Sequence, residues 1–323
     1  MARFNNSSTG QIGQLDSVRY LITPVGIYHF ESPNETSLKS TLSLLLCQTC
    51  RVPILNKDMQ VCISLAARPT NLGTRFHNYL YDELDLNFIY KAFTATDLEG
   101  AVRGIKALGF RGASVSMPFK EEIIPMLDDL DPSARAIDSV NTVVNNNGVL
   151  TGSNTDFEAV LSLVRYAPIG LGSKVLVRGS GGMAKAVVAA FKEAGFENLT
   201  VTSRNKDAGS VLAAKYGYAF DAQGLDKPGF HVLVNVTPIG MTGDNQSELA
   251  FGSDLIAEAN TVFDVVASPS ETPLIAAARS QDKHLLTGAQ VHALQAALQF
   301  EKYTGVKLSE EQITRAAEFS RSK

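Results

Sequence analysis

The chain has 323 residues, of which 45% are hydrophobic, and a formal net charge of −4 at pH 7. This length accommodates about two domains with substantial cores. The weak charge and the absence of a basic stripe argue against a nucleic-acid-binding protein, and no apolar run reaches the length of a membrane span. Three cysteines (Cys47, Cys50 and Cys62) provide no disulfide framework, so we expect a reduced, cytoplasmic protein.

The first 57 residues differ in composition from the rest of the chain. Residues 1–13 are rich in Asn, Ser, Gly and Gln, which predicts disorder. Cys47 and Cys50 have the C-x-x-C spacing of metal and redox sites, but nothing nearby completes a zinc site, so we interpret them as a chance pair. We therefore treat residues 1–57 as a partly disordered extension and expect the functional fold to begin near Lys57.

From that point, strand-like and helix-like segments alternate. Alternation of this kind predicts an α/β fold with parallel sheets that carry helices on both faces. The predicted strands cover residues 61–65, 88–93 and 112–116, and the predicted helices cover residues 74–85, 97–108 and 122–130. Farther along, strands are predicted over 175–177, 199–202, 231–236 and 262–266, and helices over 183–193, 290–303 and 309–320.

Polar residues stand at the ends of strand-like runs between residues 114 and 156. Lys120 follows Pro118 after an apolar run, Asn141 opens a second run, and Asp156 closes a third. Because strand ends deliver side chains to a shared cleft, Lys120 and Asp156 are candidates for a proton-transfer pair. Taken alone, Lys120 is also consistent with a solvated lysine, and Asp156 with a helix N-cap.

A nucleotide-binding pattern follows at residues 174–195, KVLVRGSGGMAKAVVAAFKEAG. An apolar strand leads into a glycine-rich loop and then into a helix, the order that brings a pyrophosphate to a helix N-terminus. In a G-x-G-x-x-G reading, Lys185 takes the place of the third glycine. The predicted cofactor-binding residues of this loop are Gly179, Ser180, Gly181, Gly182, Met183 and Ala184.

The turn after the next strand favours NADP over NAD. An NAD site usually has Asp or Glu there to accept a hydrogen bond from the ribose 2′-hydroxyl. This chain instead has Ser203, Arg204, Asn205 and Lys206. An arginine binds a 2′-phosphate through a charge-assisted fork, although a solvated basic turn has the same composition. No metal is expected, because the histidines lack metal-ligand spacing.

Several separate motifs resemble the shikimate dehydrogenase family, from about residue 60 to the C-terminus. They are SVSMPFKE, AIDSVNTVV, GSNTD, GSGGMAKA, NVTPIGM, DVVASPSETPL and GAQVHALQAALQFEKYTG, in the family's order. The resemblance implies a substrate-binding catalytic domain from residues 58–157 plus 289–323 and a Rossmann-like NADP-binding domain from residues 158–288. It also implies reversible hydride transfer between NADP and shikimate or 3-dehydroshikimate, in aromatic amino acid biosynthesis, by a monomer or homodimer.

The resemblance also assigns residues by position. Lys120 matches the family's catalytic lysine and Asp156 its partner aspartate, while the charge state of Lys120 stays open. Asn141 and Gln295 match substrate-binding residues, and Ser116 stands where the family usually has threonine. Thr237 and Gly288 fall in motifs that imply contact with the cofactor.

This sequence departs from the family's motifs at the residues that are expected to form the substrate pocket. Aligned on His77, the family's Ser-x-Ser-Pro motif becomes Asn71-Leu72-Gly73-Thr74, so both carboxylate-binding serines are absent. Phe119 replaces a frequent histidine, and Ala267 replaces a tyrosine. We expect weak activity on shikimate or a preference for a related hydroxylated cyclic acid. Asn71 and Thr74 remain candidate substrate residues, and Thr70, Arg68 and Arg75 are further candidates for binding the carboxylate.

Three alternatives remain. A quinate/shikimate dehydrogenase using NAD or NADP would share every motif. A non-catalytic NADP-binding regulatory protein is disfavoured because Lys120 and Asp156 are both present. A methylene-tetrahydrofolate dehydrogenase has a Tyr-x-x-x-Lys pattern, and here the tyrosine position is Ser116.

Overall fold

The computed structural model describes residues 3–7, 10–15, 18–23, 26–30 and 55–322. The chain divides into two compact units, Met1–Ile54 and Leu55–Lys323. Cys47 and Cys50 lie outside the described residues. Within the described part of the chain, no helix has both the length and the apolarity that crossing a membrane requires.

The first unit contains an antiparallel sheet of four strands in the order β1-β2-β3-β4. The strands are β1 Arg3–Ser7, β2 Gly10–Leu15, β3 Val18–Thr23 and β4 Gly26–Phe30. We expected disorder over residues 1–13, but the described residues of that stretch form β1 and part of β2. The polar composition of residues 1–13 gave no sign of these strands. The signal lies in β3, which pairs with β2 and whose β-branched and aromatic residues favour strands.

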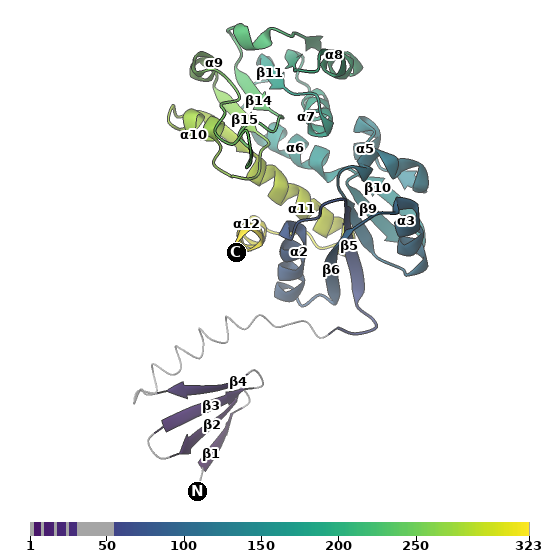
Figure 1. Ribbon diagram of the computed structural model, residues 1–323, viewed down its shortest axis with the longest axis vertical. Helices are drawn as coiled ribbons and strands as arrows, with labels where there is room; N and C mark the ends of the chain where they lie inside the picture. The colour runs from purple at the N-terminus through teal and green to yellow at the C-terminus, as the bar shows by residue number, and fades with distance from the viewer. Residues whose placement is uncertain (1–2, 8–9, 16–17, 24–25, 31–54, 323) are drawn as a thin grey trace. The chain divides into compact units, whose positions relative to one another are not determined.

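The second unit contains two six-stranded sheets, each flanked by helices (Figure 1). The first sheet has the order β6-β5-β7-β9-β10-β8. Its strands are β5 Gln60–Ala66, β6 Phe88–Thr94, β7 Gly112–Val115, β8 Asp129–Leu130, β9 Thr142–Asn146 and β10 Val149–Ser153. Strands β5, β6 and β7 are parallel, as predicted, whereas β9 runs antiparallel to both β7 and β10.

A tight hairpin explains the direction of β9. Its two loop residues, Asn147 and Gly148, have positive φ angles of 53° and 89°. Asn-Gly with both residues in this region is the preferred two-residue β-hairpin turn. The hairpin pairs Thr142 with Ser153, so the chain before β9 and the chain after β10 lie at the same end of the two strands.

Helices α2 Leu72–Glu83 and α3 Leu98–Ala107 agree with the predictions to within about two residues. The predicted helix over 122–130 is wrong. The chain forms the short α4 Phe119–Glu122, a 3₁₀ turn η1 Ile124–Met126 and strand β8 instead. Pro125 lacks an N–H and restricts the residue before it, so an α-helix cannot continue through this position unbroken. Helix α5 Pro132–Ile137, capped by Asp131, was not predicted.

The second sheet is parallel throughout, in the order β13-β12-β11-β14-β15-β16. The chain enters this sheet at the central strand β11, adds β12 and β13 on one side, and then crosses back to add β14, β15 and β16 on the other. The change of direction creates a switch point between β11 and β14, the place where α/β proteins bind ligands. Its strands are β11 Val175–Arg178, β12 Leu199–Thr202, β13 Ala219–Phe220, β14 Val232–Asn235, β15 Thr261–Asp264 and β16 His284–Thr287. Its helices and turn are α7 Gly182–Glu193, α8 Lys206–Lys215, η2 Gly224–Asp226, α9 Ser253–Glu258 and α10 Pro273–Arg279.

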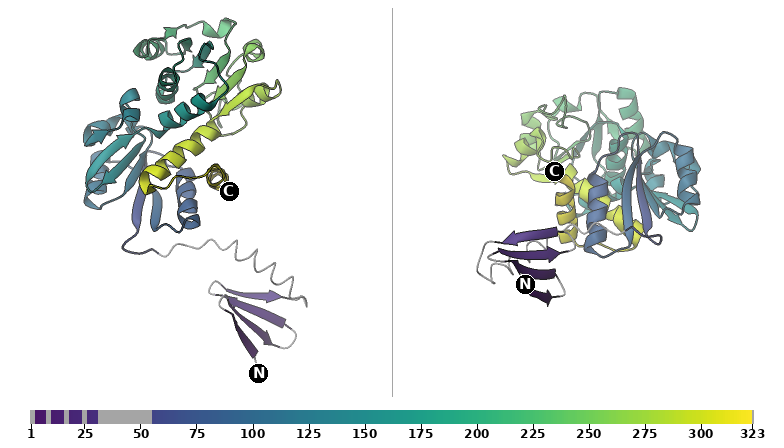
Figure 2. Two further views of the ribbon diagram at one scale, coloured as in Figure 1. Left: turned by 180° about the vertical axis from the view of Figure 1, so that it is seen from behind. Right: turned by 60° about the horizontal axis from the view of Figure 1, so that its bottom comes forward.

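Two helices connect the sheets. Helices α6 Thr155–Tyr166 and α11 Gly288–Thr304 pack against each other and run side by side from one sheet toward the other (Figures 1 and 2). The last helix, α12 Glu310–Arg321, packs against α2. Helix α11 begins beside the second sheet and ends beside the first, so its side chains contact both sheets.

Candidate functional site

A cavity of about 300 Å³ lies between the two sheets, with walls from the ends of β5 and β7 and from α2, α4, α6 and α11. The strand order and the hairpin bring these elements together. Most of the predicted catalytic and substrate residues line it, together with two predicted cofactor residues: Lys120, Asp156, Thr74, Ser116, Asn141, Gln295, Met183 and Gly288. Among the described residues, no group of three or more His, Cys, Asp or Glu side chains is arranged to hold a metal.

Lys120 and Asp156 form the predicted pair. The Lys120 ammonium, on α4, lies 2.6 Å from Asp156 Oδ2, in the first turn of α6. Their side chains are 29% and 18% exposed, so both can still be reached from the cavity. Burial by itself raises the pKa of the Asp156 carboxyl, but the Lys120 charge and hydrogen bond and the Asn141 amide outweigh it and hold that pKa below its usual value. Asp156 is therefore an anion at neutral pH.

Asn141 fixes the start of α6. Its side-chain oxygen accepts hydrogen bonds from the Thr155 N–H (2.8 Å) and from the Thr142 hydroxyl (2.8 Å). The residue is 3% exposed, so this polar network is inaccessible to bulk water. The N-cap of α6 is Asn154 rather than Asp156, because the Asn154 side chain accepts from the Phe157 N–H. Asp156 thus remains available to the cavity.

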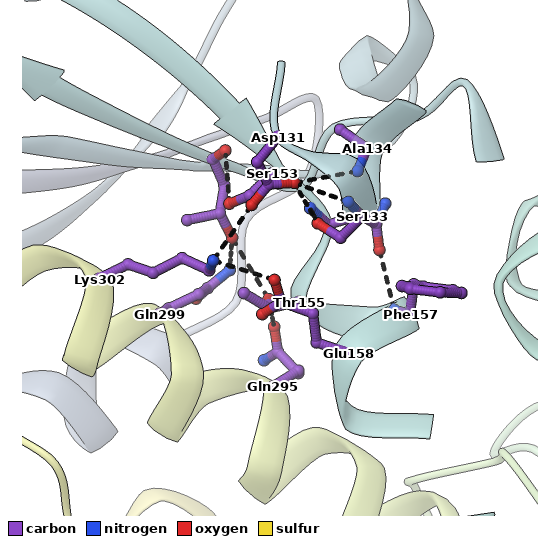
Figure 3. Close-up of polar contacts among 12 residues, drawn as sticks. Asp131, Ser133, Ala134, Ser153, Thr155, Phe157, Glu158, Gln295, Gln299 and Lys302 are labelled. Atoms are coloured by element: carbon purple, nitrogen blue, oxygen red, sulfur yellow. Dashed lines mark hydrogen bonds and ion pairs between the residues drawn. The ribbon is translucent and has the colours of Figure 1, made fainter. Parts of the chain in front are cut away.

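Helix α11 closes the network from the other side, as Figure 3 shows. Gln299 donates to the Thr142 hydroxyl at 3.0 Å, and Gln295 lies 3.4 Å from the Thr155 hydroxyl. One turn farther on, the Lys302 ammonium pairs with Glu158 of α6 at 3.0 Å and with Asp131 at 3.3 Å. These contacts hold the predicted substrate residue Gln295 at the cavity wall.

Uncommitted polar groups, among them those of Arg68, Thr70 and Thr74, lie in the part of the cavity where the family motif is absent. The Thr74 hydroxyl is buried and has no hydrogen-bond partner among the described residues. Arg68 lines the cavity, is exposed, and makes no ion pair or hydrogen bond with any described residue. Arg75, by contrast, donates to the Phe319 carbonyl at 2.9 Å and stacks on that ring, so it is committed elsewhere.

Some of the positions where this chain departs from the family motifs line the cavity and others do not. Gly73 and Ala267 line the cavity and contribute no hydroxyl to it. Asn71 is exposed at the N-terminus of α2 and is not part of the lining, so the structure does not bring this predicted substrate residue into the site. Phe119 is buried in the core of the first sheet. His77 is also fully buried, and burial lowers its pKa to about 3, so it is neutral.

Some cavity residues escaped the sequence prediction. Tyr90 and Ser114 share a 2.5 Å hydrogen bond at the cavity wall, and His292 and Gln299 line the wall formed by α11. His292, Gln295 and Gln299 are spaced at i, i+3 and i+7, which places them on one helix face, so helical periodicity from Gln295 was a usable signal. Nothing local marked Tyr90, and Ser114 belongs to the SVSMPFKE motif but was not named as a site residue, because both reach the cavity only once the sheet has formed.

The glycine loop fits a dinucleotide. Gly179 has a φ of 128°, and a Cβ there would lie 2.8 Å from Val236 Cγ2, so this position requires glycine. A Cβ on Gly181 or Gly182 would meet no heavy atom within 4 Å, which leaves open space in front of α7. Gly181 also gives α7 no side-chain cap, so the first N–H groups of the helix remain available to an anion.

The basic turn has two free cations. Asn205 caps α8 by accepting from the Ala208 N–H, and the Ser203 hydroxyl donates to the Asn205 carbonyl, so both side chains shape the turn. Arg204 and Lys206 are exposed and make no ion pair or hydrogen bond with other described residues. Free cationic side chains of this kind can bind a phosphate group.

Thr237 has a structural place beside the switch point. Its hydroxyl donates to Asn235 Oδ1 at 2.6 Å, and Asn235 donates in turn to the fully buried Asp264 at 3.0 Å. Burial raises the pKa of the Asp264 carboxyl even though Thr272 also donates to it. This network fixes the turns after β14 and β15, and Thr237 itself does not line the cavity.

Comparisons with known proteins agree with this geometry. A family model described as the shikimate dehydrogenase substrate binding domain matches residues 71–143. A shikimate dehydrogenase-like protein of Haemophilus influenzae is 53% identical over 271 residues, which cover 84% of this chain and 100% of that protein. A solved structure of a shikimate 5-dehydrogenase-like protein, also 53% identical, covers 83% of this chain and 100% of its own with a TM-score of 0.81.

A second solved structure carries ligands. It is the shikimate 5-dehydrogenase of Thermus thermophilus in complex with NADP(H) and shikimate. It is 28% identical to this chain, covers 81% of this chain and 100% of its own, and has a TM-score of 0.72.

Proposed function

The chain belongs to the shikimate dehydrogenase family and is an NADP-dependent oxidoreductase, and we propose that its substrate is a hydroxylated cyclic carboxylic acid related to shikimate. We assign substrate binding to residues 58–157 plus 289–323 and cofactor binding to residues 158–288. The observation that carries the proposal is the 2.6 Å Lys120–Asp156 pair in a cavity that also reaches the glycine-loop residue Met183.

Lys120 and Asp156 handle the hydroxyl proton. When bound, the cofactor would supply the hydride acceptor as NADP⁺ in oxidation and the hydride donor as NADPH in reduction. When an alcohol loses hydride, its hydroxyl proton must move to a base, and the Lys120–Asp156 pair is the ionisable pair at the cavity wall. Asp156 holds the lysine side chain in place, and Asn141 holds the helix turn that carries Asp156.

The carboxylate of the substrate is bound by residues other than the two serines that the family uses. We assign carboxylate binding to Arg68 and Thr74, because both line the cavity, the Arg68 guanidinium has no partner among the described residues, and the Thr74 hydroxyl is buried there without one. An arginine binds a carboxylate through two parallel charge-assisted hydrogen bonds. A buried hydroxyl without a partner costs roughly 1–3 kcal/mol, and a substrate oxygen at Thr74 would remove that cost.

Shikimate itself is expected to be a poor substrate. Gly73 and Ala267 remove a serine hydroxyl and a tyrosine hydroxyl from the pocket of this chain, which leaves substrate oxygens without donors. The missing side chains also leave more room beside the ring. A bulkier or differently hydroxylated cyclic acid therefore fits the pocket better than shikimate does.

A substrate panel tests this assignment. Shikimate, quinate, aminoshikimate and simpler hydroxy acids are oxidised with NADP or NAD, and the reduced nicotinamide is followed by absorbance. We expect NADP to be preferred and kcat/KM for shikimate to fall below about 10⁴ M⁻¹ s⁻¹, the lower end of the range for efficient enzymes. Efficient turnover of shikimate contradicts the proposed preference. An Arg68→Leu variant should raise KM for an acid substrate about tenfold and leave its methyl ester unaffected.

A further inference from the structure

Two ion pairs join helices of the second sheet to segments of the first. Lys185 of α7 lies 2.6 Å from Glu121 of α4, and Lys215 of α8 lies 2.6 Å from Asp138, which ends α5. The two pairs have the same length and similar lysine exposures of 33% and 38%. They differ in position, because Lys185 lies in the first turn of the glycine-loop helix and Lys215 ends α8.

Lys185 stands at an electrostatically unfavourable position. The N-terminus of a helix carries a partial positive charge, which repels a cation in the first turn. Its backbone N–H donates to the Gly181 carbonyl, so the residue lies one turn from the loop, and helical side chains lean toward the helix N-terminus. A cation here needs an anion nearby. In the cofactor-free protein, Glu121 is that anion.

We propose that Lys185 binds the cofactor's pyrophosphate and that Glu121 holds its ammonium group until the cofactor arrives. The third glycine of the G-x-G-x-x-G pattern is thus replaced by a charged ligand. On NADP binding, the Lys185 ammonium breaks its ion pair with Glu121 and pairs with the pyrophosphate instead. The exchange reaches the reaction centre, because Glu121 is adjacent to Lys120, whose ammonium pairs with Asp156.

The exchange is favourable on charge. Glu121 carries one negative charge and its side chain is 62% exposed, so its pairing with Lys185 is a weak surface ion pair. The pyrophosphate carries more charge and is held at the same time by the free N–H groups of α7. Glu121 therefore competes with the cofactor for one cation and weakens cofactor binding.

Binding of NADP without substrate tests the exchange independently of any substrate. The dissociation constant is measured by titration for the wild type, Lys185→Met, Glu121→Gln and the double variant. We expect Lys185→Met to weaken NADP binding about tenfold, the effect of losing a charge-assisted contact. Glu121→Gln should tighten it about threefold, because the competing anion is gone. In the Lys185→Met background, Glu121→Gln should then have no effect.

Two controls isolate the pyrophosphate. Asp138→Asn breaks the matched Lys215 pair and should leave NADP affinity within about twofold of wild type. The nucleotide 2′-AMP lacks a pyrophosphate, so all four proteins should bind it equally. Equal NADP affinity in the wild type and both single variants overturns the proposal. The proposal is also overturned if Glu121→Gln changes NADP affinity by the same factor in the wild-type and Lys185→Met proteins, because Glu121 would then act only by repelling the cofactor's negative charge. Lys185→Arg, which keeps the charge, should restore most of the affinity; failure to do so with an unchanged melting temperature also overturns it.

Discussion

At the level of single residues, the site depends on one ion pair between residues that lie 36 positions apart in the chain. Lys120 comes from a one-turn helix and Asp156 from the first turn of a long one. Asp156 is held as an anion by the lysine despite its burial. The pair therefore places a lysine at the cavity wall beside a fixed carboxylate.

Replacing Lys120 tests whether this pair moves the proton. We expect Lys120→Ala to reduce kcat by roughly 10²–10⁴-fold, the usual contribution of a positioned acid or base. The NADP dissociation constant should change by less than about twofold, because Lys120 is not in the glycine loop. Lys106→Ala is the matched control, since Lys106 also pairs with an aspartate, Asp128, at 2.8 Å but lies outside the cavity lining. Full activity in Lys120→Ala would falsify the proton-transfer assignment.

At the level of elements, the glycine loop between β11 and α7 contains glycines with different requirements. Gly179 needs its positive φ and close contact with Val236, so the fold itself requires glycine there. Gly181 has an ordinary φ of −81° and open space around its Cβ position. The fold tolerates a side chain at Gly181, whereas we propose that the cofactor needs this space.

The two glycines should therefore respond differently to alanine. Gly179→Ala is expected to lower stability by about 1–3 kcal/mol, through strain at a left-handed position, and to weaken NADP binding as well. Gly181→Ala should keep the wild-type melting temperature and still weaken NADP binding, because its methyl group occupies the space in front of α7. Thermal unfolding and NADP titration of both variants check this. A Gly181→Ala protein that binds NADP normally would mean that the pyrophosphate lies elsewhere.

The hairpin β9–β10 is the element that assembles the substrate side. Its Asn147-Gly148 turn reverses the chain and brings Asn141 to the residues that follow β10. The Asn141 side chain then accepts a hydrogen bond from the Thr155 N–H, beside Asp156. The Asn-Gly pair was visible in the sequence, yet we expected a wholly parallel sheet, because the alternation of strands and helices elsewhere obscured this local signal.

At the scale of the whole molecule, residues 55–323 form a compact unit with its own cores. We expect a chain that starts at Met59 to fold cooperatively and to bind NADP with wild-type affinity, because β5 begins at Gln60. Circular dichroism, thermal unfolding and NADP titration measure both properties. A chain that starts at Asn71 is the control, and it should not fold because it lacks β5, an inner strand of the first sheet. A Met59 chain that folds but does not bind NADP would assign a binding role to the first 58 residues.

The α/β class, the glycine loop, the basic turn and the Lys120–Asp156 pair could all be predicted from the amino-acid sequence. The glycine loop and the basic turn lie in short strand-loop-helix segments, whose geometry follows from neighbouring residues, whereas the Lys120–Asp156 pair was inferred from strand ends and from the family's motifs. Only the tertiary structure excluded Asn71 from the cavity, brought in Tyr90 and Ser114, and paired Lys185 with Glu121. Those outcomes depend on side-chain direction and on contacts between segments far apart in the chain, and both are set by how sheets and helices pack.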